Sequence, residues 1–259
     1  MNHILLAVLI VSAIGLIAGL GLAIASVVMA VPVDKKAEAI RECLPGANCG
    51  ACGFSGCDGY AAALAEGKAA PNLCSAGGDD TAQKISEILK VEVSADKKVA
   101  VVCCNGSFDK TTRAFAYDGI QSCTAASLLQ GGPLDCKYGC VGLLDCVKAC
   151  PFNAIIVNDS HPTVCKDLCV GCGKCVSTCP KGVIKLLPID YKTAVLCNNK
   201  EKGAPVVKAC QSSCIACTMC QRSCEKGAIK VIDNLAQIDY DLCDGCGKCK
   251  EVCKRKVII

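Results

Sequence analysis

The first 33 residues differ from the rest of the chain in their pattern of hydrophobic and polar positions. Residues 4–31 are 28 consecutive positions without a charged side chain, which is long enough for a helix that crosses a bilayer with some tilt. No Lys or Arg precedes this stretch, as a secretory signal would require, whereas Lys35, Lys36 and Arg41 follow it. The positive-inside rule predicts a single-pass anchor in the cell (inner) membrane with the bulk of the chain on the cytoplasmic side.

The predicted anchor carries no ionisable side chain, so we do not expect an ion path along it. Gly15 and Gly19 form a G-x-x-x-G step. Such a step permits close approach of another membrane helix, although glycine is also common in membrane helices without that role.

Beyond the anchor, apolar positions occur only in short runs. Residues 58–67 and 81–90 have helical periodicity, residues 98–104 are typical of a strand, and residues 123–129 favour another helix. Four short β-like pieces each follow a run of cysteines, at residues 153–157, 182–186, 227–231 and 256–259. These elements predict an α+β fold of small modules with short β-hairpins and helices.

Cysteine usage changes this picture, because the chain has 27 cysteines, 3% aromatic residues and no Trp. Such a chain cannot fill a large core with bulky side chains. The C-x2-C spacings cannot all be disulfides, since adjacent short loops would be strained and the number of cysteines is odd. Metal binding is the better interpretation. Zinc remains the alternative metal, because paired C-x2-C motifs also build zinc ribbons.

The most informative spacing lies in residues 134–180, where two runs of cysteines each close on Cys-Pro. The second run follows C-x2-C-x2-C-x3-C-P, with Cys169 as its first and Cys179 as its last cysteine. This is the spacing of bacterial ferredoxins, in which three cysteines bind one [4Fe–4S] cube and the fourth binds the neighbouring cube. Zinc sites normally come as two separated pairs of cysteines, so three cysteines in a row at two-residue gaps followed by Cys-Pro favour iron–sulfur clusters.

An internal duplication repeats this pair of runs. A shift of 74 residues brings Cys136, Cys140, Cys146 and Cys150 onto Cys210, Cys214, Cys220 and Cys224. The same shift brings Cys169, Cys172, Cys175 and Cys179 onto Cys243, Cys246, Cys249 and Cys253. Eight coincidences at one offset predict two related modules. The stretches 101–107 and 194–200 also look alike, so we expect a strand before the cysteines of each module.

The exchange of the fourth ligand predicts four cubes in these two modules. The four ligand sets are Cys136, Cys140, Cys146 with Cys179; Cys169, Cys172, Cys175 with Cys150; Cys214, Cys217, Cys220 with Cys253; and Cys243, Cys246, Cys249 with Cys224.

A fifth cube is predicted nearer the anchor. Cys49, Cys52, Cys57 and Cys74 form a C-x2-C-x4-C-x16-C pattern with glycines between and beside the ligands, where the backbone must turn tightly and direct N–H groups at the sulfurs. The expected division of the chain is an anchor at 1–33, a single-cluster domain at 34–92, a first two-cluster module at 93–188 and a second one at 189–259.

Two departures leave some ligands open. Leu143 stands where the second module has Cys217, so the outer ligands of the first run are less well defined, and Cys210 competes as a ligand in the second module. Seven cysteines remain outside the five sets: Cys43, Cys103, Cys104, Cys123, Cys165, Cys197 and Cys210. For Cys103, Cys104 and Cys123 a role as small buried side chains is favoured over a further metal site.

Charge argues against nucleic-acid binding. The formal net charge is +4, but an oxidised cube with four thiolates carries a formal −2, so five cubes bring the total to about −6. From residue 181 onward there are 14 Lys or Arg against 8 Asp or Glu. This surplus, including Lys254, Arg255 and Lys256, either steers an acidic soluble ferredoxin or compensates the anionic cubes.

Taken together, the membrane helix, the segment LPGANCGACGFSGC with its distal Cys74, and GCVGLLDCVKACPFNAI resemble the B subunit of the Rnf complex across nearly the whole chain. These complexes are membrane-bound ferredoxin:NAD⁺ oxidoreductases that transport sodium ions or protons. The segment NCGACGFSGC is also similar to the cluster domain of the corrinoid iron–sulfur protein. Two ferredoxin modules, rather than the usual one, resemble the clostridial and acetogenic form of this iron–sulfur subunit.

The resemblance implies a relay that takes electrons from reduced ferredoxin and passes them to other subunits of the complex. No G-x-G-x-x-G, P-loop or flavin fingerprint occurs, so NAD and flavin binding are expected in partner chains. We expect no catalytic acid, base or nucleophile, and His3 and His161 are interpreted as incidental. The alternatives are a polyferredoxin-like subunit of another membrane oxidoreductase, such as a hydrogenase or dehydrogenase, and a zinc-stapled adaptor without redox function.

Overall fold

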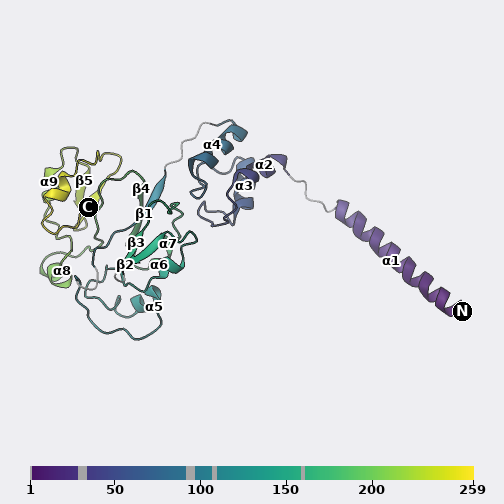
Figure 1. Cartoon of the computed structure of the whole chain (residues 1–259), viewed down its shortest axis with the longest axis horizontal. Coiled ribbons are helices and arrows are strands. Elements are labelled where there is room, and N and C mark those ends of the chain that lie inside the picture. The colour runs from purple at the N-terminus through teal and green to yellow at the C-terminus, as the bar shows by residue number, and fades with distance from the viewer. Residues whose placement is uncertain (1, 29–33, 92–96, 107–109, 159–160) are drawn as a thin grey trace.

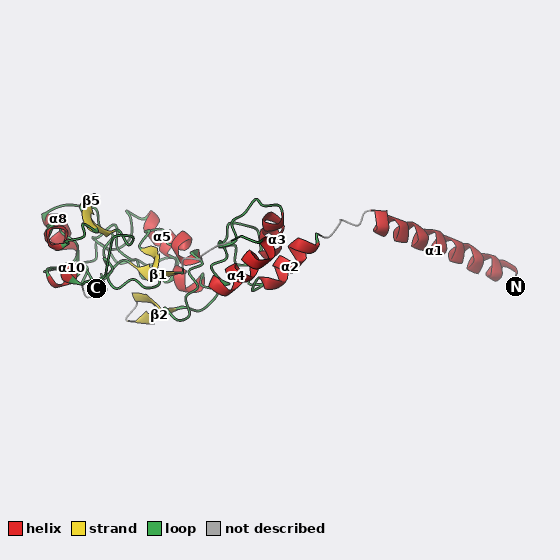
Figure 2. Cartoon of the chain, turned by 90° about the horizontal axis from the view of Figure 1, so that it is seen from above, coloured by secondary structure: helices red, strands yellow, loops and turns green. Residues whose placement is uncertain are grey.

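The computed structural model describes the chain in five stretches, residues 2–28, 34–91, 97–106, 110–158 and 161–259. It confirms the predicted α+β class: helices and short antiparallel strands alternate along the chain after one long N-terminal helix (Figure 1). Figure 2 shows from a second direction that this first helix lies apart from the remaining elements. The expected domain boundaries near residues 33 and 92 lie outside the described residues.

Helix α1 (Asn2–Val28) is the predicted anchor. Its 27 residues span about 40 Å at 1.5 Å per residue, more than the thickness of a hydrocarbon core. Within it, residues 4–26 meet the length and composition of a membrane-crossing helix. Leu and Ile side chains are exposed along the whole helix, with Leu22 at 73% and Ile17 at 72%. Residues 29–31 of the predicted span lie outside the described part of the chain.

Three helices form the first compact unit after the anchor: α2 (Lys35–Cys43), α3 (Cys57–Ala65) and α4 (Gly78–Leu89). They bury Ile40, Tyr60, Leu64 and Ile85 against each other. Helices α3 and α4 confirm the predicted periodic segments. Helix α2 is an additional helix that is capped by Asp34, whose carboxylate accepts a hydrogen bond from the backbone N–H of Lys36 at 2.9 Å.

The duplication in the sequence is also a duplication in structure. Strands β2 (Ile155–Asn158) and β3 (His161–Val164) form an antiparallel hairpin, and β5 (Ile229–Ile232) with β6 (Leu235–Ile238) repeats it in the same register. The short helices inside the cysteine runs repeat likewise: α6 (Asp145–Lys148) corresponds to α9 (Met219–Ser223), and α7 (Lys174–Thr178) to α10 (Lys248–Glu251).

The predicted strand before the cysteines is present in the first module. Strand β1 (Lys98–Val102) pairs antiparallel with β4 (Ile184–Pro188), so the strand that opens the module joins the one that closes it. In the second module, Val195 bridges Ile258 in the same manner, and Leu196 N–H donates to the carbonyl of Val257 at 2.7 Å. Each module is therefore closed by its two ends.

Each module contains one further short helix. Helix α5 (Cys123–Leu128) in the first module confirms the helix predicted there, and α8 (Ala204–Ala209) lies in the second module.

The cores of both modules are built from cysteines and small aliphatic residues. The core of the first module packs Cys146 and Cys175 against Ile155, Val183 and Ile184, and the second module repeats this composition. Among the described residues, Tyr60 is the only aromatic side chain in the buried core. Packing around the cysteine sulfurs thus takes the place of packing between large side chains.

Gly171 marks the closest contact between β1 and a cysteine loop. It adopts φ of +66°, and a Cβ at this position would overlap the backbone carbonyl of Lys98. Gly173 in the same loop also has a positive φ, +74°, but a Cβ there would meet only Leu186 at 3.7 Å. Both positions favour glycine by backbone conformation, and only Gly171 also requires it by contact.

We therefore expect Gly171→Ala to destabilise the protein more than Gly173→Ala. The second substitution should cost about 1–2 kcal/mol from the left-handed conformation alone, whereas the first must also displace β1. The measurement is the denaturant midpoint of anaerobically purified protein, followed by circular dichroism. Equal midpoints for the two variants would contradict a tight β1 contact.

Candidate iron–sulfur sites

The cysteines of the single-cluster pattern converge beside α3. Cys49, Cys52, Cys57 and Cys74 line one small cavity together with Tyr60. The Tyr60 hydroxyl donates to the carbonyl of Ala70 at 2.7 Å and accepts from the backbone N–H of Leu73 at 3.2 Å, which fixes the loop that carries Cys74. Asn48 Oδ1 accepts from the backbone N–H of Cys57 at 2.8 Å. The structure therefore brings all four predicted residues of this set together.

A second cavity lies in the first module. It is lined by Cys150, Cys169, Cys172 and Cys175, with Ala100 from β1 and Ile155 from β2 among its walls. The backbone N–H of Ala100 donates to Cys169 Sγ at 3.4 Å, and that of Ala154 to Cys150 Sγ at 3.4 Å. Hydrogen bonds of this kind stabilise the thiolate form of a ligand.

The second module repeats this cavity with the residues displaced by 74 positions. Cys224, Cys243, Cys246 and Cys249 line it, with Ile229 and Ile238 of the β5–β6 hairpin. Thr193 Oγ1 lies 3.8 Å from Cys243 Sγ.

The other predicted set of the second module is grouped around Cys220. Burial raises the pKa of the Cys220 thiol to about 11, and the neighbouring thiols of Cys214, Cys217 and Cys253 raise it further. These are the four cysteines that the exchange rule assigned to one cube.

In the first module the corresponding group differs from the predicted set. The cavity there is lined by Cys123, Cys140, Cys146 and Cys179. Burial raises the pKa of Cys146 to about 11, with Cys123 and Cys179 as the neighbouring thiols that add to the shift. Cys136, which the exchange rule assigned to this set, is absent from the lining; its neighbours are Cys104 and Cys210.

Asp145 positions Cys123 in this cavity. Its carboxylate accepts three hydrogen bonds at the start of α5, from Ser122 Oγ at 2.8 Å and from the backbone N–H groups of Cys123 at 2.7 Å and Thr124 at 3.3 Å. Asp145 is itself the first residue of α6, which carries Cys146. One signal in the sequence pointed to Cys123: Leu143 leaves the first module one ligand short of the second.

Burial keeps these thiols protonated unless a cation replaces the proton. It raises the pKa of Cys140 and of Cys175 to about 12 in each case, and neighbouring cysteines add to both shifts. Bound iron supplies that positive charge. Among the described residues, no group of three His, Cys, Asp or Glu side chains is arranged to hold a single metal ion. A cube accepts ligands spread around it, so the four-cysteine groups fit [4Fe–4S] clusters better than zinc.

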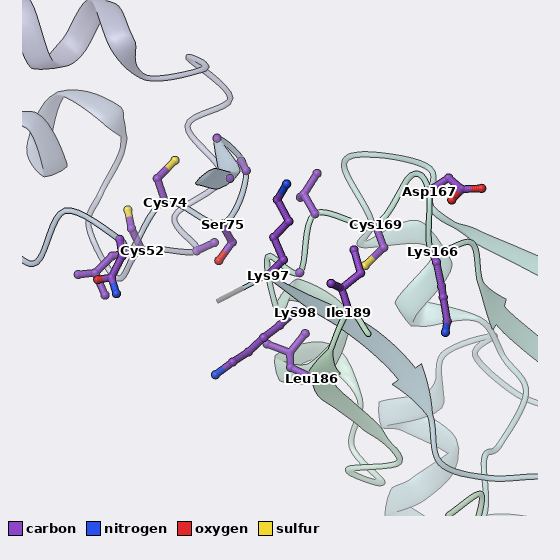
Figure 3. A pocket seen from close by; sticks show the side chains of 18 residues that line it. Cys52, Cys74, Ser75, Lys97, Lys98, Lys166, Asp167, Cys169, Leu186 and Ile189 are labelled. Carbon is purple, nitrogen blue, oxygen red and sulfur yellow. The ribbon is translucent and has the colours of Figure 1, made fainter. Parts of the chain in front are cut away.

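A cleft separates the single-cluster unit from the first module. Its volume is about 820 Å³; Cys52 and Cys74 lie on one wall and Cys169 on the other (Figure 3). Lys97, Lys98 and Lys166 also line it. Cys49 and Cys172 approach each other closely enough that Cys49 contributes to the raised pKa of Cys172, after burial as the main cause. The two cysteine groups on either side of the cleft are therefore neighbours.

Exposure distinguishes the second module from the others. All 27 cysteines lie within the described residues, and only Cys217 and Cys246 are exposed. Both belong to predicted ligand sets of the second module. Its sites therefore lie nearer the surface than those of the first module.

Comparison with known protein families agrees with this arrangement. Residues 44–76 match the family described as "Putative Fe-S cluster", and residues 166–185 and 235–258 each match a family described as "4Fe-4S binding domain". The chain therefore carries several [4Fe–4S] sites.

Three relatives match nearly the whole chain. The B subunit of the Na(+)-translocating ferredoxin:NAD(+) oxidoreductase complex of Acetobacterium woodii is 42% identical over 260 residues, covering 100% of this chain and 78% of that protein. The B subunit of the proton-translocating complex of Clostridium ljungdahlii is 42% identical, covering 96% and 88%. The B subunit of the ion-translocating oxidoreductase complex of Methanosarcina acetivorans is 37% identical, covering 96% and 97%. Identity at this level over this length shows that the chain belongs to the family of B subunits of ion-translocating ferredoxin:NAD⁺ oxidoreductase (Rnf) complexes.

Proposed function

We propose that this chain is the iron–sulfur relay of a membrane-bound, ion-translocating complex, accepting electrons from reduced ferredoxin and passing them to flavin-containing partner subunits towards NAD⁺. The observation that carries this proposal is the convergence of cysteines in groups of four. Each bound cube would gain or lose one electron. Four thiolate ligands leave no open iron position, so the protein's part is to hold, shield and space the clusters.

We propose five ligand sets, with one change from the sequence prediction. Cys123 replaces Cys136, because the former lines the cavity with Cys140, Cys146 and Cys179. The proposed sets are Cys49, Cys52, Cys57, Cys74; Cys123, Cys140, Cys146, Cys179; Cys150, Cys169, Cys172, Cys175; Cys214, Cys217, Cys220, Cys253; and Cys224, Cys243, Cys246, Cys249.

The placement of the sets supports a direction for electron flow. The exposed Cys217 and Cys246 favour the second module as the part that meets a soluble donor. The neighbouring Cys49 and Cys172 connect the first module to the single-cluster unit, which follows the membrane anchor in the chain. We propose that electrons pass from the second module through the first to the cluster held by Cys49, Cys52, Cys57 and Cys74.

Exposed lysines of the second module support docking of an acidic ferredoxin there. Lys254 and Lys256 are exposed. Arg255, predicted with them as part of the docking surface, points inward instead: its Nη2 donates to the carbonyl of Cys210 at 2.7 Å. The proposed docking surface therefore uses Lys254 and Lys256, while Arg255 has a structural role.

The chemistry that this chain lacks would lie in its partners. The apolar surface of α1 supports a single membrane crossing, and Lys35 and Lys36 support a cytoplasmic location for the residues after it. Because no nucleotide or flavin motif occurs in the sequence, we propose that the flavins and NAD⁺ are held in other chains of the complex.

The first test removes the chain from the complex. Membrane vesicles that lack it should lose NADH formation driven by reduced ferredoxin, because electrons cannot reach the flavin-containing partners, and adding the purified chain should restore it. NADH oxidation with an artificial acceptor serves as the control for the remaining subunits. Undiminished NADH formation from ferredoxin would refute the proposal and favour another membrane oxidoreductase.

The second test concerns the revised ligand set. Cys123→Ala should reduce the iron content by up to about four atoms per chain, or leave a three-iron cluster detectable by EPR, because one cube loses a ligand. Cys165→Ala is the matched control, since Cys165 is half-buried and lines none of the four small cavities. Full iron content and unchanged spectra in Cys123→Ala would contradict Cys123 as a ligand and favour Cys136 as the fourth ligand of this cube.

The third test concerns docking. The double variant Lys254→Glu/Lys256→Glu should be reduced by ferredoxin severalfold more slowly at low ionic strength, and the difference should shrink as salt is added. Stopped-flow absorbance measures the rate. Lys68→Glu/Lys84→Glu changes the same charge on exposed residues of the single-cluster unit and should not slow it. An equal effect of both pairs would argue against docking at the second module.

A further inference from the structure

Four cysteines outside the five sets lie together where the two modules meet. Cys104, Cys136, Cys197 and Cys210 are each less than a tenth exposed, at 8%, 7%, 7% and 5%. Two come from the first module and two from the second. None of them lines any of the four small cavities described above.

The sulfurs of the first pair, Cys104 and Cys210, both lie next to Gly106. A Cβ on Gly106 would lie 3.6 Å from Cys104 Sγ and 3.5 Å from Cys210 Sγ, so both sulfurs face the same point. It would also lie only 2.7 Å from Thr111 Oγ1. Glycine therefore leaves the space in which Thr111 approaches and donates its hydroxyl to Cys210 Sγ at 3.5 Å.

The second pair, Cys136 and Cys197, is gathered around Asn199. This side chain is 1% exposed, and its Nδ2 donates to Cys136 Sγ at 3.4 Å. The backbone N–H of the same residue donates to Cys197. The two pairs are neighbours, because the backbone N–H of Asn105, the residue after Cys104, donates to the carbonyl of Leu196, the residue before Cys197, at 3.1 Å.

Internal symmetry relates the two halves of this group. The backbone N–H of Cys140 donates to Cys104 Sγ at 3.4 Å, and the backbone N–H of the equivalent Cys214 donates to Cys197 Sγ at 3.3 Å. Cys136 and Cys210 are equivalent by the duplication of 74 residues. Each module thus contributes the same two cysteines, one from its opening strand region and one ahead of its first ligand run.

Backbone pairing between the modules closes the site. Thr111 forms a β-bridge with Cys210, Gln211 N–H donates to the carbonyl of Lys110 at 2.8 Å, and Thr112 N–H to that of Ala209 at 3.2 Å. Arg255 holds Cys210 from the other side through its carbonyl.

The hydrogen bonds distinguish this group from ordinary buried thiols. Each of the four sulfurs accepts at least one N–H or O–H, as the thiolate ligands of iron–sulfur clusters do. Cys103, the adjacent residue, shows the ordinary case: it is 3% exposed, packs against Val99 and Leu187, and its thiol donates to the carbonyl of Val101 at 3.8 Å. A neutral thiol is only a weak acceptor and gains little from several donors.

We propose that Cys104, Cys136, Cys197 and Cys210 bind a sixth [4Fe–4S] cluster at the junction of the two modules. In transfer from a cellular cluster carrier, the bonds between iron and the carrier's ligands break and four Fe–S bonds to these cysteines form. The four thiol protons pass to the freed ligands or to solvent, and no oxidation state changes. The site lies between two proposed cubes, because its hydrogen-bond donors Cys140 and Cys214 are ligands of one cube in each module.

This position joins the two modules into one electron path. The role of this cluster in an electron path rests on the proposed function, whereas the binding of a cluster by these four cysteines does not. A chain with six cubes that accepts no electrons from ferredoxin would therefore remove the function and leave the site intact.

The first experiment measures iron, sulfide and zinc in the anaerobically purified full chain. Six cubes correspond to about 24 iron atoms per chain and five to about 20. The variant Cys104→Ala/Cys210→Ala should lose about four iron and four sulfide, together with one component of the low-temperature EPR spectrum. Cys103→Ala, equally buried and adjacent, should lose none. Unchanged iron in the double variant, an equal loss in Cys103→Ala, or zinc at this site in the unmodified chain would overturn the proposal.

The second experiment keeps all four cysteines, so it can be carried out even if the protein does not fold without them. Thr111→Val preserves shape but removes the donor to Cys210 Sγ, so the midpoint potential of one cluster should fall in an EPR-monitored redox titration. The control is Thr112→Val, because Thr112 Oγ1 donates to the carbonyl of Ala209 at 3.3 Å rather than to a sulfur. A Thr111→Val protein with all potentials unchanged would refute a cluster bound by Cys210.

Discussion

Ligation of buried thiols is the interaction on which the rest of this structure depends. Burial raises the pKa of Cys140, Cys146, Cys175 and Cys220 to about 11 or 12, so these groups stay protonated unless iron displaces the proton. The same sulfurs occupy the positions that large apolar side chains hold in ordinary cores. Cluster binding and folding are thereby joined, as in other small metal-binding domains.

The duplicated architecture follows from the same constraint. In the proposed ligand sets, exchange of the fourth ligand would link the two cubes of a module, because α6 and α9 each carry a proposed ligand of one cube and are followed by a proposed ligand of the other. Closure of each module by its two ends, through β1 and β4 in the first and the Val195 bridge in the second, holds the opening strand against the cysteine loops. The modules then meet along residues 110–112 and 209–211, where the proposed sixth site lies.

Charge and exposure vary along the proposed relay in a way that suits its function. The second module has the exposed cysteines Cys217 and Cys246, which are proposed ligands, and the exposed Lys254 and Lys256, whereas no cysteine of the first module is exposed. Burial lowers the pKa of Lys181, and the nearby Cys136 and Cys179 oppose that shift. A lysine in this position balances negative charge at two of the proposed sites.

The sequence by itself determined the family, the α+β class, the long apolar helix near the N-terminus, the duplication and most of the cysteine groups that the structure brings together. These features depend on composition and on short spacings such as C-x2-C-x2-C-x3-C, which is typical of [4Fe–4S] binding. Only the tertiary structure decided the partners of isolated cysteines. Cys123 lies beside Cys140 because Asp145 of α6 accepts a hydrogen bond from the backbone N–H of Cys123 in α5. Cys104 lies beside Cys210 because two segments far apart in the chain pair at the junction of the two modules. The sequence likewise predicted Arg255 as part of a basic surface, whereas in the structure its guanidinium donates to the carbonyl of Cys210. Residues that are far apart in the chain form no short spacing pattern in the sequence, so their contacts become visible only in the folded structure.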